Sequence, residues 1–166
     1  MKTAWLLPTL LFALPCWAGT GNASRQEAEY YVAAYALHYG VPVEFVRALV
    51  EQESGWRQCA ISRKGAAGLM QLMPDTARKL NVQDRCDAKQ NVSGGVRHLA
   101  RLMIKFHGDL RLVAAAYYVG ERVIEVRGLQ YANPDVVAYV ASIRERVERQ
   151  KQIRSANVQR TPGRTR

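Results

Sequence analysis

The chain has 166 residues and is strongly basic, with 24 Lys and Arg against 14 Asp and Glu and a formal net charge of +10. This length favours one domain over two. The positive excess lies mostly in residues 144–166, where no aromatic residue interleaves with the cations and no nucleic-acid-binding motif occurs. We therefore expect no nucleic acid among its partners. The three histidines show no metal-ligand spacing, so we expect neither a metal nor another cofactor.

Residues 1–18 predict a signal peptide. Lys2 supplies the positive start, residues 5–14 form a short apolar run, and residues 16–18 offer small residues at a cleavage site. The run is shorter than the roughly 20 apolar residues that a membrane span needs, although an uncleaved anchor is the alternative. We expect an exported, periplasmic protein whose mature chain begins near Gly19.

Helical periodicity dominates the first half of the mature chain. The Ser-Arg-Gln-Glu sequence at residues 24–27 predicts a capping box that opens a first helix, and Gly40 is its expected terminator. Pro42 fits the first turn of a second helix. The apolar stripes of these helices consist of Val32, Tyr35, Ala36 and Tyr39 in the first and Val43, Val46 and Val50 in the second.

The second half continues with helices and ends in a basic tail. Helices are predicted from Pro74 to Leu80, over residues 92–106 and 110–119, and from residue 133 onward, whereas only a small β-hairpin is expected near residues 67–72. The sequence thus predicts a mainly α fold with one domain over residues 24–150. Residues 151–166 are expected to form a disordered tail, with attraction to an anionic envelope as the functional alternative.

Two cysteines remain in the predicted mature chain, Cys59 and Cys86. In an exported protein such a pair most simply forms a disulfide. The alternative is a cysteine nucleophile paired with His98, but neither cysteine lies in a recognisable nucleophile motif. We expect the disulfide to stabilise the fold by about 3.5 kcal/mol through the chain entropy of the unfolded state.

Glu53 continues the apolar stripe of the second predicted helix, whereas Glu51 is expected to face solvent. A carboxylate on an inward face loses its hydration unless it is paired or protonated. Burial raises its pKa, and a raised pKa suits a general acid near neutral pH. The alternative is a glutamate at a fading end of the stripe, paired with an arginine. The residues that follow favour the catalytic interpretation.

Residues 53–56 are Glu-Ser-Gly-Trp, and residues 60–77 have the sequence AISRKGAAGLMQLMPDTA. This run closely resembles the signature of the soluble lytic transglycosylases, which share a fold with goose-type lysozyme. The resemblance implies an α+β, lysozyme-like domain that is mainly helical. It also implies that Glu53 is the catalytic acid, because the family uses the Glu of this Glu-Ser pair.

The resemblance assigns further residues one position at a time. Ser62 stands where a family serine contacts the substrate, and Gln71 and Met73 match residues that line the sugar groove. Asn91 and Gly95 match the family's Asn and Gly at the start of the long helix, where we expect a structural role.

Residues 115–120 resemble the family's Ala-Ala-Tyr-Asn-Ala-Gly motif, in which Tyr117 would orient the catalytic carboxyl. Two departures stand out, because Tyr118 replaces the family's asparagine and Glu121 its usual proline. Ordinary helix packing is the alternative for Tyr117.

Asp135 occupies the position of a family Glu, four residues before Tyr139. The resemblance implies that Asp135 belongs to the substrate site, although a helix-dipole charge is an equal alternative. We expect Tyr139 to be a packing residue.

The resemblance implies a peptidoglycan lytic transglycosylase. Such enzymes cleave the β-1,4 bond between N-acetylmuramic acid (MurNAc) and N-acetylglucosamine (GlcNAc), and the C6 hydroxyl of MurNAc attacks its own anomeric carbon to give 1,6-anhydroMurNAc. Glu53 would act first as acid and then as base. The alternatives are a lysozyme-type hydrolase on the same fold and a weakly active peptidoglycan-binding or assembly protein.

The chain also resembles minimal members that remodel the wall locally for an envelope-spanning machine. We therefore expect peptidoglycan glycan strands as the substrate and components of a secretion, conjugation or pilus apparatus as candidate partners. We expect the protein to act as a monomer.

Overall fold

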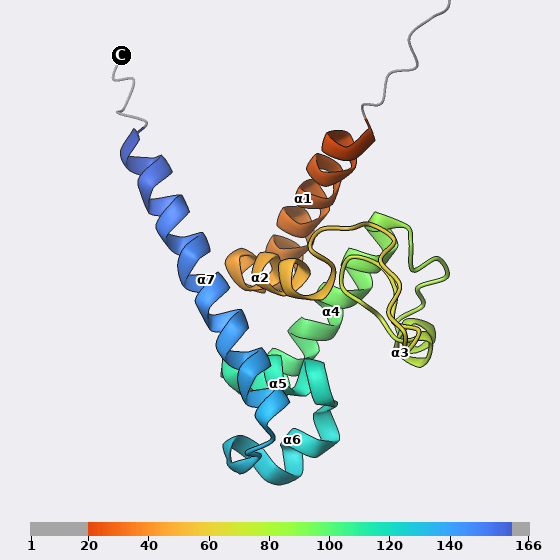
Figure 1. Ribbon diagram of the computed structural model, residues 1–166, viewed down its shortest axis with the longest axis vertical. Coiled ribbons are helices and arrows are strands. Elements are labelled where there is room, and N and C mark those ends of the chain that lie inside the picture. The colour runs from red at the N-terminus through yellow and green to blue at the C-terminus, as the bar shows by residue number, and fades with distance from the viewer. Residues whose placement is uncertain (1–19, 161–166) are drawn as a thin grey trace, which may run out of the picture.

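The computed structural model describes residues 20–160, and within this range the protein is built almost entirely from helices (Figure 1). The elements are α1 (Thr20–Tyr39), α2 (Val43–Ser54), α3 (Pro74–Lys79), α4 (Ala88–Lys105), α5 (Leu110–Val119), α6 (Glu121–Arg127), the 3-10 helix η1 (Gly128–Gln130) and α7 (Pro134–Arg160). The predicted signal peptide, residues 1–18, lies outside the described residues, as do residues 161–166. No helix in the described range is long and apolar enough to cross a bilayer.

Helix α1 begins earlier than the sequence predicts. The capping box at residues 24–27 was expected to open this helix, but the helix already runs from Thr20 through these residues, so that prediction is wrong. No proline stands between Thr20 and Ser24, and one glycine costs only about 1 kcal/mol, so the helical hydrogen bonds continue past the capping sequence. Gly40 does end the helix, with a φ of 68°.

The expected β-hairpin near residues 67–72 is reduced to two isolated antiparallel bridges, one between Ile61 and Ala67 and one between Ala67 and Leu72. The described residues contain no longer strand. The segment between α2 and α3 is therefore a folded loop, held by a few backbone hydrogen bonds, such as the pair between Ala67 and Leu72, together with side-chain contacts.

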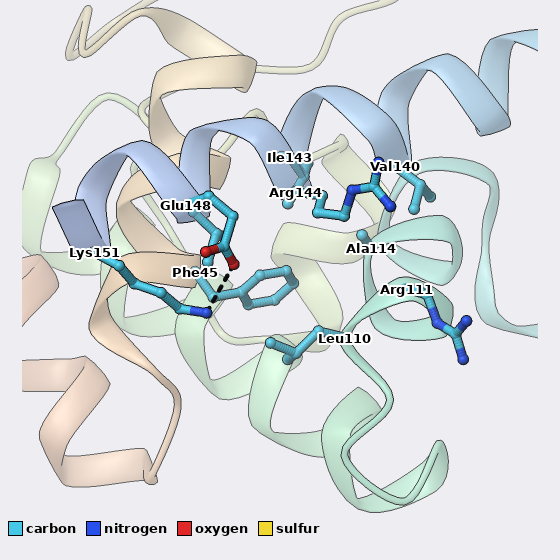
Figure 2. Close-up of a pocket in the computed structure, with 10 residues that line it drawn as sticks. Phe45, Leu110, Arg111, Ala114, Val140, Ile143, Arg144, Glu148 and Lys151 are labelled. Carbon is cyan, nitrogen blue, oxygen red and sulfur yellow. Dashed lines mark hydrogen bonds and ion pairs between the residues drawn. The ribbon is translucent and has the colours of Figure 1, made fainter.

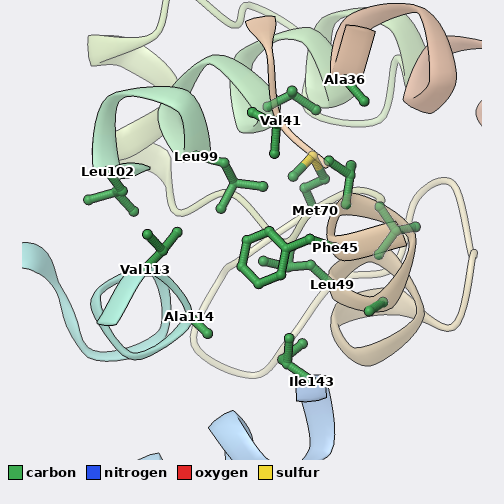
Figure 3. Packing of buried hydrophobic residues seen from close by; sticks show 14 of the residues in the cluster. Ala36, Val41, Phe45, Leu49, Met70, Leu99, Leu102, Val113, Ala114 and Ile143 are labelled. Carbon is green, nitrogen blue, oxygen red and sulfur yellow. The ribbon is translucent and has the colours of Figure 1, made fainter. Parts of the chain in front are cut away.

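The main core surrounds α2 (Figure 3). Phe45 and Leu49 of α2 pack among Leu99 of α4, Val113 of α5 and Ile143 of α7, and all five side chains are buried. Helix α1 packs along α4 and against α2, while α7 crosses both α2 and α5 (Figure 1). This arrangement brings helices from both ends of the chain to the C-terminal end of α2.

Helix α6 has no strong periodic signal in the sequence, and ion pairs hold it against α4. Arg101 pairs with Glu121 at 2.6 Å, and Lys105 pairs with Glu125 at 3.0 Å. The partners are four residues apart on both helices, so each pair lies one turn from the other. This arrangement gives a structural reason for Glu121, which replaces the proline of the family pattern.

The tail that was expected to be disordered is helical as far as the structure describes it, because α7 continues through Arg160. The prediction for residues 151–160 is therefore wrong. Arg154 donates to Glu44 of α2 at 2.6 Å, and Lys151 pairs with Glu148 one turn away at 2.9 Å. These pairs extend the helix beyond the apolar core, although each exposed pair contributes less than about 1 kcal/mol.

The structure joins Cys59 to Cys86 as a disulfide, with a Cα–Cα distance of 4.6 Å. The bond links the loop after α2 to the loop before α4. The expected pairing is thus present, and the alternative of a cysteine nucleophile beside His98 is excluded in this oxidised state.

We predict that the double variant Cys59→Ser/Cys86→Ser loses about 3.5 kcal/mol of unfolding free energy, because its unfolded chain gains the entropy of an open loop. Urea unfolding of the oxidised wild type and the variant measures this difference. Reductant should destabilise the wild type and leave the variant unchanged. Equal stability of the two oxidised proteins would contradict the prediction.

Candidate active site

The last turn of α2 holds Glu53 in a rigid position. Gly55 ends the helix in a left-handed conformation, and its N–H donates to the carbonyl of Glu51 at 3.0 Å. The hydroxyl of the buried Ser54 donates to the carbonyl of Val50, also at 3.0 Å. The Gly55 N–H and the Ser54 hydroxyl therefore both bond to carbonyls of α2. Neither of them takes up the carboxyl of Glu53.

Glu53 is half-buried, and its carboxyl has one hydrogen-bond donor among the described residues. The hydroxyl of Tyr139 in α7 donates to Glu53 Oε1 at 2.5 Å, and Tyr139 itself is only 6% exposed. Burial raises the pKa of Glu53, and the hydrogen bond from Tyr139 opposes this effect without cancelling it. The carboxyl thus keeps its proton to a higher pH than an exposed glutamate does.

The tyrosine that orients the carboxyl is not the one expected. Tyr117 was predicted for this role, but its hydroxyl donates to the carbonyl of Met70 at 2.7 Å. Tyr139, expected to be a packing residue, makes the bond to Glu53 instead. The sequence did contain a signal for this contact. Tyr139 lies on the apolar stripe of α7, and a buried tyrosine hydroxyl usually has a hydrogen-bond partner.

Tyr117 is nevertheless half-buried and packs against the core that contains Tyr139. Burial, followed by the charge of nearby Glu53, raises the pKa of Tyr117 well above its usual range. Burial also raises the pKa of Tyr139, and the charge and hydrogen bond of Glu53 act in the same direction. Both tyrosines therefore remain neutral donors wherever Glu53 works.

The loop of residues 60–73 is attached to α4 by Asn91, whose side chain is fully buried. Its Oδ1 accepts from the N–H of Met70 at 2.8 Å, and its Nδ2 donates to the carbonyls of Ala67 and Arg85 at 3.0 and 2.8 Å. Tyr117 binds the carbonyl of Met70, so both backbone polar groups of that residue have partners. The structural role expected of Asn91 fits this geometry.

Two glycines permit the close approach of this loop to α4. A Cβ at Gly68 would lie 2.1 Å from Asn91 Nδ2, and a Cβ at Gly95 would lie 2.4 Å from the sulfur of Met70. Gly68 also has a φ of 86°, a conformation that side chains disfavour. Gly95 therefore has the packing role that its position suggested.

The predicted groove residues lie on the loop or at its end. The hydroxyl of Ser62 accepts from the N–H of Ala66 at 3.0 Å. The amide nitrogen of Gln71 donates to the carbonyls of Ala60 and Gly68 at 2.8 and 2.9 Å. Met73 precedes α3 and is 42% exposed. Ser62 and Gln71 thus stabilise the loop, and their contacts to substrate stay a prediction.

Two aspartates, Asp75 and Asp135, are candidates for the second carboxylate that most glycosidases use, and both lie in solvent. Asp75 is exposed and pairs with Arg78 at 2.7 Å. Asp135 is exposed in the first turn of α7, one turn before Tyr139, and its carboxylate makes no hydrogen bond or ion pair with the described residues. Neither carboxylate shares the buried environment of Glu53.

Glu51 differs from its expected role as a solvent-facing charge. Its carboxylate lies within 3.6 Å of Arg146 and 3.4 Å of Arg149, both on α7. Beside it, Gln52 accepts from the hydroxyl of Ser142 at 2.7 Å. The expectation failed because α7 covers this side of α2, and these contacts fix the helix that carries Tyr139.

Two other features near the core are His98 and a pocket between α2, α5 and α7. Burial lowers the pKa of His98 to about 4, and its ring lies 5.6 Å from that of Tyr117. No group of three His, Cys, Asp or Glu residues within the described range could hold a metal. A pocket of about 130 Å³ lies between α2, α5 and α7, where the Glu148–Lys151 ion pair spans its edge (Figure 2). Its lining does not include Glu53.

A sequence profile described as "Transglycosylase SLT domain" matches residues 30–135, more than half of the chain. The chain belongs to the transglycosylase SLT domain family.

Sequence relatives of this SLT domain include the "Membrane-bound lytic murein transglycosylase F 1" of Alkalilimnicola ehrlichii. It is 38% identical over 91 residues, which cover 51% of this chain and 18% of the relative. The "Membrane-bound lytic murein transglycosylase F" of Vibrio cholerae is 39% identical over 100 residues, covering 54% and 19%. The chain spans about a fifth of the length of these curated relatives.

Solved structures share the fold of this SLT domain. An inactive mutant of the lytic transglycosylase Slt from Pseudomonas aeruginosa has a TM-score of 0.68 and 23% identity, covering 76% of this chain and 24% of that one. The 70 kDa soluble lytic transglycosylase of Escherichia coli has a TM-score of 0.62 and 20% identity, covering 71% and 23%. The predicted mainly α, lysozyme-like fold is confirmed.

The profile match ends at residue 135, four residues before Tyr139. The segment of the SLT domain that resembles the family therefore contains Glu53 but not the donor that binds its carboxyl. A tertiary contact across 86 residues of sequence supplies that donor.

We predict that Asn91→Ala lowers the unfolding free energy of the SLT domain by about 3 kcal/mol, because three backbone groups, two of them in buried hydrogen bonds, lose their partner. Urea unfolding measures the change. Ser93→Ala, a half-buried position on the same helix, serves as the control and should change stability little. An Asn91→Ala variant as stable as that control would contradict the prediction.

We also predict that Glu53→Gln stabilises the SLT domain at neutral pH. Because the folded pKa of Glu53 is raised, the folded state binds more protons than the unfolded state above about pH 4, and stability falls as pH rises to the folded pKa. Gln carries no such cost. Urea unfolding should show the variant as the more stable protein at pH 7 and equal stability below about pH 4. No difference at pH 7 would refute this prediction.

Proposed function

We propose that this protein is a peptidoglycan lytic transglycosylase that cleaves the MurNAc–GlcNAc β-1,4 bond, with Glu53 as its single catalytic acid and base. The environment of Glu53 is the main support for this proposal. In an SLT domain, the glutamate of the Glu-Ser pair is half-buried, has a carboxyl with a raised pKa and accepts a hydrogen bond from Tyr139. A protonated, immobilised carboxyl is what protonation of a glycosidic oxygen requires.

The proposed reaction has two steps. Glu53 first donates its proton to the glycosidic oxygen while the bond from that oxygen to C1 of MurNAc breaks. The C6 hydroxyl of the same MurNAc then forms a bond to C1, and its proton returns to Glu53. The product is a 1,6-anhydro sugar, and no water is consumed. Between the steps, the hydrogen bond from Tyr139 stabilises the carboxylate.

The ion pairs of two other carboxylates, Asp75 and Glu51, support an internal nucleophile over activated water. Inverting glycosidases place a second carboxyl about 6.5–9.5 Å from the acid, and retaining enzymes place it about 5–5.5 Å away. Here Asp75 is exposed in an ion pair, and Asp135 is exposed on α7. Glu51 is engaged by Arg146 and Arg149. The substrate's own hydroxyl therefore replaces a protein base in this proposal.

We further propose that Ser62, Gln71 and Met73 line the glycan groove and that Asp135 lies at its α7 side. Ser62, Gln71 and Met73 belong to the loop of residues 60–73, which Asn91 and Tyr117 hold in place. The domain boundaries at residues 24 and 150 belong to the same proposal, with α7 extending beyond the second boundary.

The proposed location is the periplasm, reached through the predicted signal peptide. The disulfide supports an oxidising compartment. In this setting a monomer would act on peptidoglycan strands and open the wall locally for a secretion, conjugation or pilus system. If deletion of the gene left assembly of every such system intact, this last role would be wrong.

We predict that purified peptidoglycan treated with the wild type releases anhydromuropeptides, which are one water lighter than hydrolysed products. Glu53→Gln should reduce their release by at least about 100-fold, because it removes the acid and retains the shape of the side chain. Mass spectrometry of the soluble products measures both.

Other outcomes would identify the alternative functions. Reducing-end products from the wild type would make the protein a lysozyme-type hydrolase and require a water-activating base. Muropeptide binding without release of soluble fragments would favour a binding or assembly protein. Equal release by the wild type and Glu53→Gln would exclude Glu53 as the acid.

A further inference from the structure

Tyr118, the residue that replaces the family's asparagine, is an exposed aromatic ring beside the catalytic carboxyl. Its ring stacks on that of Tyr139, with centroids 4.5 Å apart and an interplanar angle of 22°. Tyr139 in turn donates to Glu53. The side chain of Tyr118 is nevertheless 49% exposed, so burial in the core does not account for this large apolar group.

The residue before Tyr118 fixes the position of this part of α5. Tyr117 precedes it in α5 and binds the carbonyl of Met70, which anchors this end of the helix against residues 60–73. Tyr118 faces α7 through its stacked partner. Because Tyr139 covers one face of the ring, the exposed area belongs to the opposite face and the edge.

We propose that Tyr118 is a sugar-stacking platform that binds a pyranose ring of the glycan strand next to the bond that Glu53 cleaves. The face of an aromatic ring carries negative charge density and attracts the C–H groups that a β-linked pyranose presents from one side of its ring. Parallel stacking on Tyr139 holds the platform in one orientation, so the ring is already ordered before a sugar binds.

The position of the platform gives it a role in specificity. An asparagine would offer hydrogen bonds to sugar hydroxyl or amide groups, whereas a tyrosine ring recognises the apolar face of the sugar. The chain therefore exchanges a polar contact for an aromatic one beside Glu53. This inference rests on the proposed function for the identity of its ligand, a β-1,4-linked hexosamine strand.

The test measures binding in a background without the catalytic acid, so that turnover does not interfere. Peptide-free glycan strands are titrated by calorimetry into Glu53→Gln and into the double variant Glu53→Gln/Tyr118→Asn. We predict that the second substitution weakens binding by about fivefold to tenfold, the factor expected for one lost aromatic contact. Tyr118→Phe in the same background should retain affinity within about twofold, because the ring remains.

A matched control and a second readout separate binding from positioning. Tyr30→Asn makes the same substitution at another exposed tyrosine, on α1, and should not change affinity. In the active protein, Tyr118→Asn should raise KM and leave the pH profile of kcat unchanged. Tyr139→Phe should move the alkaline limb of that profile to higher pH, because it removes a bond that lowers the pKa of Glu53.

Unchanged affinity in Glu53→Gln/Tyr118→Asn would overturn the platform. A shifted pH profile in Tyr118→Asn with unchanged affinity would also overturn it and make Tyr118 a positioning residue that acts through Tyr139. Failure of the proposed function is distinguishable from both results. If the wild type released no fragments while Tyr118→Asn still weakened glycan binding, the platform would stand and the proposed lyase activity would be wrong.

Discussion

The site depends on the three hydrogen bonds that Asn91 makes inside the protein. The loop between α2 and α3 has no ladder of its own, yet several of its backbone groups are buried and must have partners. Asparagine suits this position because its short side chain offers an acceptor and two donors together. Gly68 and Gly95 allow the loop to approach α4 closely enough for these bonds to form. Without that approach, the segment that follows Glu53 would lose its attachment to α4 through Asn91.

Two neighbouring glutamates on α2 show how surroundings divide chemical roles. Glu51 lies within reach of two arginines of α7, whereas Glu53, half a turn away, has a neutral tyrosine as its partner. The two arginines hold Glu51 in ion pairs, whereas burial raises the pKa of Glu53 and favours its protonated form. One helix, α7, supplies both environments. Two carboxyl groups of one helix thus acquire different roles from different surroundings.

Much of the fold could be predicted from local patterns in the sequence. The predicted range of α5 coincides with the observed Leu110–Val119, since an apolar run between an aspartate and a glycine defines it locally. Glu53 could be singled out as a carboxyl on an apolar stripe, but the motif that follows it, rather than the stripe alone, favoured a catalytic role. Tyr139 could not be identified in this way, since its partner lies 86 residues earlier in the chain. The helical extension past residue 150 was missed on the same grounds, because Glu44, which pairs with Arg154, is distant in sequence.

The long separation between Glu53 and Tyr139 also affects how the protein folds. Contacts between distant parts of a chain form late, because a large loop must close before they contribute stability. If α7 were not docked, Glu53 would lack its donor and much of its cover. A chain in that state would carry the complete motif without the surroundings that raise the pKa of Glu53.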